Sequence, residues 1–176
     1  MKNENEVFEA AFARTMSHEG GYVDSAFDVG GETKYGISKT AYPDLDIASL
    51  TPDDAKKIYF KDFWIKQKLG LIESPIIATK IFDLTINMGA FGGGLVVQQA
   101  LHDLDKIVIM DGIIGIETVT AINSCNPIIY TSALIGRACA KYCAIYDKFV
   151  SDSKSEDAIS FYRNCLKSWL RRTLEV

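Results

Sequence analysis

Glu19 and Asp28 are two acidic residues whose types and spacing fit a carboxylate pair that flanks a substrate cleft. They lie nine residues apart in the segment HEGGYVDSAFDVGGETKYGIS, residues 18–38, which is rich in glycine and lacks a helical period. Two carboxyl groups on opposite sides of a cleft are the usual apparatus of glycoside hydrolysis. For Asp28 a turn-forming role is an equally good interpretation, and for Glu32 simple exposure is favoured.

A helix is predicted from Asn5 to His18, directly before this segment. Its apolar side chains recur every three or four positions and form one face. The same face reaches Glu19 one turn later, and Gly20-Gly21 then ends the helix. Burial and the negative end of the helix dipole both raise the pKa of a carboxyl group, as a general acid requires. The alternative is that Glu19 is a solvated residue of the last turn. The predicted face consists of Phe8, Ala11, Phe12, Thr15 and Met16.

The glycine-rich segment itself predicts a small irregular hairpin, or β-like flap. Apolar and polar residues alternate loosely from Tyr22 to Ile37, and Gly30-Gly31 is a turn signal. A short helix is expected from Ser38. Asp28, on such a flap, can face a carboxyl group at the end of the preceding helix across a cleft.

This segment resembles the motif of glycoside hydrolase family 108, whose members are N-acetylmuramidases and often phage endolysins. The family pattern reads E-G-G-Y, a few residues, then D-P-G-G-x-T-x-Y-G-I, and Val29 stands here in place of the proline. The resemblance implies that Glu19 is the catalytic acid and that Asp28 assists it. The spacing to Thr33 is also similar to the Glu-Asp-Thr triad of phage-type lysozymes. Matching residues that the resemblance places at the substrate are Tyr22, Thr33 and Tyr35.

Thr51-Pro52 begins a further helix, which we expect to continue to about Trp64. Its aromatic residues Phe60, Phe63 and Trp64 could line a sugar groove. Packing in the core is the favoured interpretation for each of them singly.

A second polar pair lies on a helix that is otherwise apolar. Ser74-Pro75 begins this helix, which runs to Gly89 and is expected to be central and largely buried. Asp83 and Asn87 are four residues apart and share a face, and buried polar groups need partners. They match the family pattern F-D-x-x-x-N-x-G, which favours contact with the substrate or support of the flap. A purely structural network is the rival interpretation.

The C-terminal half is similar to the peptidoglycan-binding region that follows the catalytic part in family 108. Two long helices, about 127–150 and 156–174, close the chain. The basic stripe on the last helix is most simply a solvated face. We expect a catalytic part at 1–90 and a peptidoglycan-binding part at 91–176, packed as one globular unit. The matching residues are Gln99, Ala100, Leu101, Asp111, Gly112, Ile114, Gly115 and Thr118, with Ile116 where proline is usual, and the stripe is Arg163, Lys167 and Arg171.

Composition excludes several classes of function. The chain has 176 residues and a net charge of −4, which does not suggest a nucleic-acid partner. Its two histidines and four cysteines fit no metal motif, so we expect no metal and no other cofactor. The thiols are expected to be buried and free. The N-terminus is unlike a signal peptide, and no segment is long enough to span a membrane. We therefore expect a protein that is made in the cytoplasm and reaches the cell wall after release. We also expect it to be a monomer.

We therefore expect an all-α, lysozyme-like fold with a small β-like flap after the first helix. The expected reaction is hydrolysis of the β-1,4 bond between N-acetylmuramic acid and N-acetylglucosamine in peptidoglycan glycan strands. Glu19 would protonate the leaving oxygen, and Asp28 would stabilise the developing cation or position the water. Two alternatives stay open: a lytic transglycosylase, which closes a 1,6-anhydro ring, and a non-catalytic wall-binding or secretion-associated protein.

Overall fold

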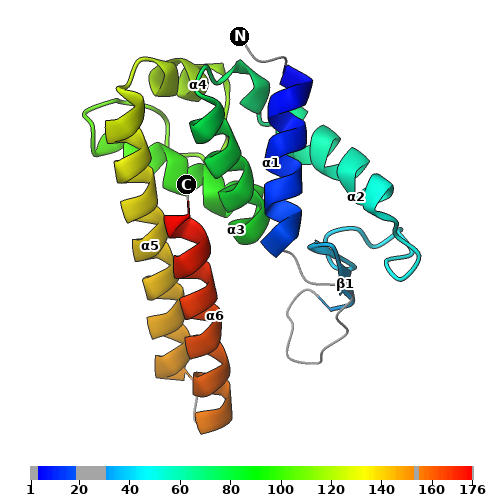
Figure 1. Cartoon of the computed structure of the whole chain (residues 1–176). Helices are drawn as coiled ribbons and strands as arrows, with labels where there is room; N and C mark the ends of the chain where they lie inside the picture. Colours follow the sequence, from blue (N-terminus) through cyan, green and yellow to red (C-terminus); the bar gives the residue numbers. More distant parts are fainter. Residues whose placement is uncertain (1–3, 19–30, 153–154, 176) are drawn as a thin grey trace.

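Helices make up most of the protein in the computed structural model, which describes residues 4–18, 31–152 and 155–175. A two-stranded sheet lies between the first two helices in sequence, and α3 passes through the middle of the helical body (Figure 1). The expected all-α, lysozyme-like fold with a small flap is confirmed. In chain order the elements are α1 (Glu4–His18), β1 (Thr33–Lys34), β2 (Ile37–Ser38), α2 (Pro52–Ile58), the π-helix η1 (Tyr59–Ile65), the 3₁₀ turn η2 (Leu69–Leu71), α3 (Pro75–His102), α4 (Ile116–Asn123), α5 (Pro127–Asp152) and α6 (Glu156–Leu174).

The helix α1 buries the face that its apolar spacing predicts. Phe8, Ala11 and Thr15 are buried, and the two other members of the face are half-buried. The ring of Phe8 lies edge-on to the rings of Trp64 and Phe82, with centroids 5.5 and 5.8 Å apart. Edge-on contacts of this kind stabilise a core beyond the area that they bury. Apolar packing therefore decides which side of α1 faces α3.

The two strands form a minimal hairpin whose turn is fixed to the core. β1 and β2 pair antiparallel, and the turn residues Tyr35 and Gly36 have φ values of +53° and +76°. Positive φ at both positions is what a two-residue hairpin turn with the right twist requires. The hydroxyl of Tyr59 in η1 donates a hydrogen bond of 2.6 Å to the carbonyl of Tyr35. The predicted flap is thus confirmed for residues 31–38.

The short helix predicted from Ser38 does not form. Residues 39–50 are turns and bends, although the N–H of Tyr42 donates to the carbonyl of Ser38 at 3.0 Å as in a single helical turn. Pro43 disfavours helical backbone at the residue before it. That turn therefore cannot propagate into a helix.

The helix predicted from residue 51 to Trp64 changes its geometry halfway. Thr51 and Asp54 form a capping box at the start of α2, with hydrogen bonds of 3.2 Å in both directions. From Tyr59 to Ile65 the backbone follows a π-helix, in which the hydrogen bonds span five residues. Tyr59 and Trp64 are both buried, which confirms the core interpretation of Trp64.

The central helix α3 is interrupted at Gly89, where the sequence predicts a helix end. Gly89 has φ 76° and ψ 156°, a conformation that only glycine adopts readily. The segment before it is buried from Ile77 to Thr85 except at Thr79. After it, Gly93 lies so close to α3's own earlier turns that a Cβ would come within 2.8 Å of Thr85. The kink therefore brings the two segments of α3 into close contact.

The helices α5 and α6 run antiparallel and close the chain, with α5 packed against α3 (Figure 1). Tyr142 of α5 stacks on Trp169 of α6 with ring centroids 5.2 Å apart. The predicted bounds of α6 are confirmed, and α5 extends two residues beyond its predicted end. The basic stripe of α6 is exposed, as the solvated-face interpretation requires: Arg163, Lys167 and Arg171.

The four cysteines are free, as predicted, but none of them is fully buried. Cys143 is exposed, whereas Cys125, Cys139 and Cys165 are half-buried. The expectation of burial was wrong because residues that are neighbours in the sequence of a helix point to different faces, so apolar neighbours do not bury a cysteine. Partial burial raises the pKa of the three remaining thiols, which keeps them protonated near neutral pH.

The turn at Asp111-Gly112 is held by a buried glutamine of α3. Gln98 is 1% exposed and donates to the Asp111 carboxylate at 2.8 Å, while its own carbonyl oxygen accepts from the N–H of Gly112 at 2.8 Å. The hydrogen bond from Gln98 lowers the pKa of Asp111. The family resemblance placed the matching glutamine at Gln99, which is exposed. The glutamine that binds Asp111 and Gly112 is instead Gln98.

The same turn approaches Gly94 so closely that we expect Gly94→Ala to destabilise the protein by about 1–3 kcal/mol. A Cβ at Gly94 would come within 2.0 Å of the backbone carbonyl oxygen of Gly112, and backbone cannot move aside cheaply. The measurement is the free energy of unfolding in urea. Gly136→Ala in α5 is the control, because nothing lies within 4 Å of its Cβ and it should be neutral or stabilising. Equal unfolding free energies for Gly94→Ala and the wild type would contradict the prediction.

Candidate functional site

The candidate site lies around the C-terminal end of α1, beside the hairpin (Figure 1). Glu19, Tyr22 and Asp28 lie outside the described residues, so their predicted roles remain predictions. The described residues on either side of residues 19–30 in the sequence belong to the last turn of α1 and to the hairpin. The contacts of these elements matter because the last turn of α1 directly precedes Glu19 in the sequence.

The hairpin residues expected at the substrate are both half-buried. The hydroxyl of Thr33 donates to the carbonyl of Gly31 at 3.0 Å, which bends the chain where it enters β1. Tyr35 packs against the core, and the ammonium group of Lys34 lies 5.6 Å from the centroid of its ring. The hydroxyl of Thr33 keeps acceptor capacity for a ligand, whereas Tyr35 mainly anchors the hairpin.

Asp83 lies in a buried ion pair that joins three helices. Its carboxylate is 5% exposed and accepts from Nε of Arg172 in α6, at 2.9 Å to one oxygen and 3.0 Å to the other. A terminal guanidinium nitrogen of Arg172 also lies 2.9 Å from Oδ1. The hydroxyl of Thr15 in α1 donates to the same oxygen at 3.2 Å. For Asp83, these contacts fit a structural network, which was the rival to the interpretation that it contacts the substrate.

Asn87 lies one turn beyond Asp83 and contacts the other C-terminal helix. Its amide nitrogen donates to the hydroxyl of Tyr142 in α5 at 2.8 Å. Burial of Tyr142 raises the pKa of its phenol, so this hydroxyl stays protonated. Both polar residues of the predicted pair therefore bind the C-terminal helices in this structure.

Lys80 belongs to the same network, and sequence reasoning did not single it out. It is 4% exposed, and its ammonium group donates to the carbonyls of Arg172, Thr173 and Glu175 at 3.4, 2.9 and 2.5 Å. Burial lowers the pKa of Lys80, while the nearby carboxylate of Asp83 opposes the shift. A lysine in an apolar helix, three residues before a buried aspartate, was the signal available in the sequence.

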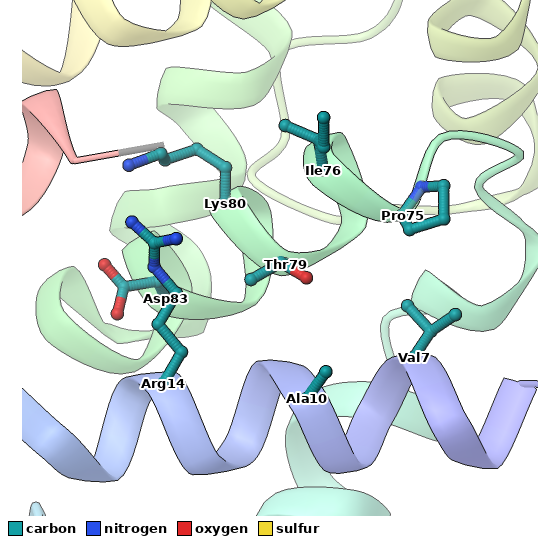
Figure 2. Close-up of a pocket in the computed structure, with 8 residues that line it drawn as sticks. All are labelled: Val7, Ala10, Arg14, Pro75, Ile76, Thr79, Lys80 and Asp83. Carbon is teal, nitrogen blue, oxygen red and sulfur yellow. The ribbon is translucent and has the colours of Figure 1, made fainter.

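A cavity of about 480 Å³ lies between α1 and the first segment of α3. Figure 2 shows Arg14 reaching from α1 toward Lys80 and Asp83, with the apolar lining at the other end. The charged end lies near the C-terminal turns of α1, and the cavity extends from there toward the start of that helix. The apolar part is lined by Val7, Ala10, Pro75 and Ile76.

The described part of the chain offers no group of three or more histidine, cysteine, aspartate or glutamate side chains that could hold a metal ion. Within the same residues no helix is both long and apolar enough to span a membrane.

Residues 12–89 match the family model described as Glycosyl hydrolase 108. The match begins in the second half of α1, includes the hairpin and ends at the kink in α3. The solved structure of SagA from Brucella abortus has a similar fold, with a TM-score of 0.68 and 22% sequence identity over 95% of this chain and 97% of that chain. No curated protein matches the sequence significantly. The similarity to SagA extends the shared fold to α4, α5 and α6.

Proposed function

We propose that this chain, whose residues 12–89 resemble the glycosyl hydrolase 108 family, is a peptidoglycan hydrolase of the N-acetylmuramidase type. The bond cleaved is the β-1,4 linkage between N-acetylmuramic acid and N-acetylglucosamine. The family match carries this proposal, because its range contains Glu19, Asp28 and the glycine-rich motif between them. No cofactor takes part in the proposed reaction.

The structure around the end of α1 supports Glu19 as the general acid. Ala11 and Thr15, on the face that leads to Glu19, are fully buried. A carboxyl group that continues this face would lose solvation and lie at the negative end of a helix dipole, and both effects raise its pKa. A glutamic acid that is protonated near neutral pH can donate its proton to the leaving oxygen.

The C-terminal half is part of the proposal as the region that contacts the glycan strands. Its Asp111-Gly112 turn, held by Gln98, is the element that resembles peptidoglycan-binding regions. The protein would act on the cell wall after release from the cytoplasm, as an endolysin does, and as a monomer.

Digestion of purified sacculi followed by mass analysis of the products tests the proposed function. A hydrolase adds water across the glycosidic bond and gives reducing muropeptides. A lytic transglycosylase gives 1,6-anhydro products that are lighter by one water. Unchanged sacculi, with the protein bound to them, would identify a wall-binding protein and overturn the proposed activity.

Asp28→Asn is expected to lower turnover by roughly 100-fold, the effect of losing one electrostatic stabiliser of the transition state. Glu32→Gln should stay near the wild-type rate, and it is the matched control from the same segment. Both rates are measured on sacculi, with the melting temperature as a check on folding. A mild effect of Asp28→Asn would assign Asp28 to the turn alone, since asparagine makes the same turn hydrogen bonds. A severe effect of Glu32→Gln alone would reverse the two roles.

A further inference from the structure

Thr15 is a buried hydroxyl on the face of α1 that otherwise buries apolar side chains. It is 0% exposed, and its hydroxyl donates to Asp83 of α3 at 3.2 Å, across the interface between the two helices. A threonine in a helix can instead satisfy its hydroxyl on its own backbone, three or four residues earlier. Thr85 of α3, also 0% exposed, bonds locally in this way, to the carbonyl of Phe82 at 2.9 Å. Thr15 therefore differs from Thr85 in joining two elements.

The acceptor of this hydrogen bond cannot rotate freely. Both oxygens of Asp83 accept from Nε of Arg172, at 2.9 and 3.0 Å, and the pair is almost fully buried. This N–H is shared by the two oxygens, and the contact is charge-assisted and buried, so it restrains the carboxylate. Arg172 lies on α6, whose end is itself held by Lys80 of α3 through three backbone carbonyls. The direction of the Thr15 hydrogen bond is thus set by α3 and α6 together.

This hydrogen bond fixes the rotation of α1 about its own axis close to its C-terminal end. Apolar contacts such as Phe8 against Phe82 are not directional and tolerate small rotations, whereas a hydrogen bond to a fixed carboxylate is directional. In the sequence, Thr15 lies four residues before Glu19, and α1 ends at His18. A small rotation of the last turn would change where the following side chain points.

We propose that Thr15 and Asp83, held by Arg172, are positioning residues for Glu19. They act through the orientation of the last turn of α1 and not by contact with the substrate. The proposal rests on the proposed function, in which Glu19 is the acid. It assigns to the C-terminal helix α6 a role in aligning the catalytic group of the N-terminal half.

The test is Thr15→Val, which keeps the shape and the buried volume and removes the hydroxyl. We expect kcat on sacculi to fall by roughly tenfold or more, with KM within about twofold of the wild type, because the acid is misplaced while substrate binding is not. Thr15→Ser restores the hydroxyl and should recover most of kcat. Thr85→Val is the matched control, since it removes an equally buried hydroxyl that bonds only within its own helix, and it should keep the wild-type kcat. Thermal unfolding verifies that each variant is folded at the assay temperature.

Three results would overturn the proposal: a wild-type kcat for Thr15→Val, an equal loss for Thr85→Val, or no recovery with Thr15→Ser. A separate readout covers the case in which the wild type does not digest sacculi, which would refute the proposed function. Hydrogen exchange of the peptide that covers residues 12–18 should then be faster in Thr15→Val than in the wild type and in Thr85→Val. Equal exchange in all three proteins would show that Thr15 does not position the end of α1.

Discussion

Replacing Glu19 with glutamine is expected to remove nearly all release of sugar products from sacculi, with turnover falling by about 10²–10⁴-fold. The amide has almost the shape of the carboxyl group but cannot donate a proton to the leaving oxygen. The measurement is the initial rate of muropeptide release, with the melting temperature expected to stay at the wild-type value.

Glu9→Gln provides a control on the same helix. Glu9 is about half exposed and pairs on the surface with Lys56 of α2 at 2.6 Å. Removing its charge should leave the rate unchanged, because surface ion pairs contribute little. A Glu19→Gln variant that digests sacculi at the wild-type rate would refute the assignment of the acid.

Arg172→Met is expected to lower the free energy of unfolding by roughly 3–5 kcal/mol, the usual cost of leaving one member of a buried ion pair without its partner. Asp83 is 5% exposed in an apolar helix. In the variant it would lose its hydrogen bonds from Arg172 and keep the one from the hydroxyl of Thr15. Urea unfolding, followed by circular dichroism, gives the measurement. The helices α1, α3 and α6 should be destabilised together, because Asp83 of α3 accepts from both Arg172 of α6 and Thr15 of α1.

The matched control is Arg137→Met, which removes an arginine of α5 that pairs with Asp103 on the surface. Both of these side chains are partly exposed to solvent, so the loss should be at most about 1 kcal/mol, well below that of Arg172→Met. The double variant Asp83→Leu/Arg172→Met should recover much of the stability lost by Arg172→Met, since an apolar pair of similar volume carries no unpaired charge. Equal stability of Arg172→Met and the wild type would show that the ion pair is not a main support of the fold.

Much of the fold follows from local signals in the sequence. Capping residues and prolines mark the starts of α2 and α3, and Gly89 marks the break in α3, because these residues act through their own backbone geometry. The sequence predicts a turn at Gly30-Gly31, whereas the turn of the hairpin in the structure lies at Tyr35-Gly36. The π-helix could not be anticipated, since its pattern of apolar residues is compatible with an ordinary helix.

The network around Asp83 shows what the sequence could not provide. The pattern of α3 indicated that Asp83 needs a partner, but Arg172 lies 89 residues away and borders an exposed basic stripe. Arg171 and Arg172 are adjacent in sequence, yet one is exposed and the other is buried. Which arginine turns inward depends on how α6 packs on α5 and thereby faces Asp83 of α3. The assignment of Glu19 and Asp28 as acids rests on sequence and family resemblance, because both residues lie outside the described residues.

The π-helix at residues 59–65 has a consequence for comparing this chain with its relatives. In an α-helix, residues five apart point about 140° away from each other, so Tyr59 and Trp64 could not both enter one core. With hydrogen bonds that span five residues, the two side chains lie nearly above one another, and both are buried. Such a helix is equivalent to an α-helix with one inserted residue. A relative that lacks one residue here would keep the surrounding helices in place but would present a different side chain to the core. An alignment with such a relative therefore needs a one-residue gap within 59–65, or positions on one side of this helix are compared with the wrong partners.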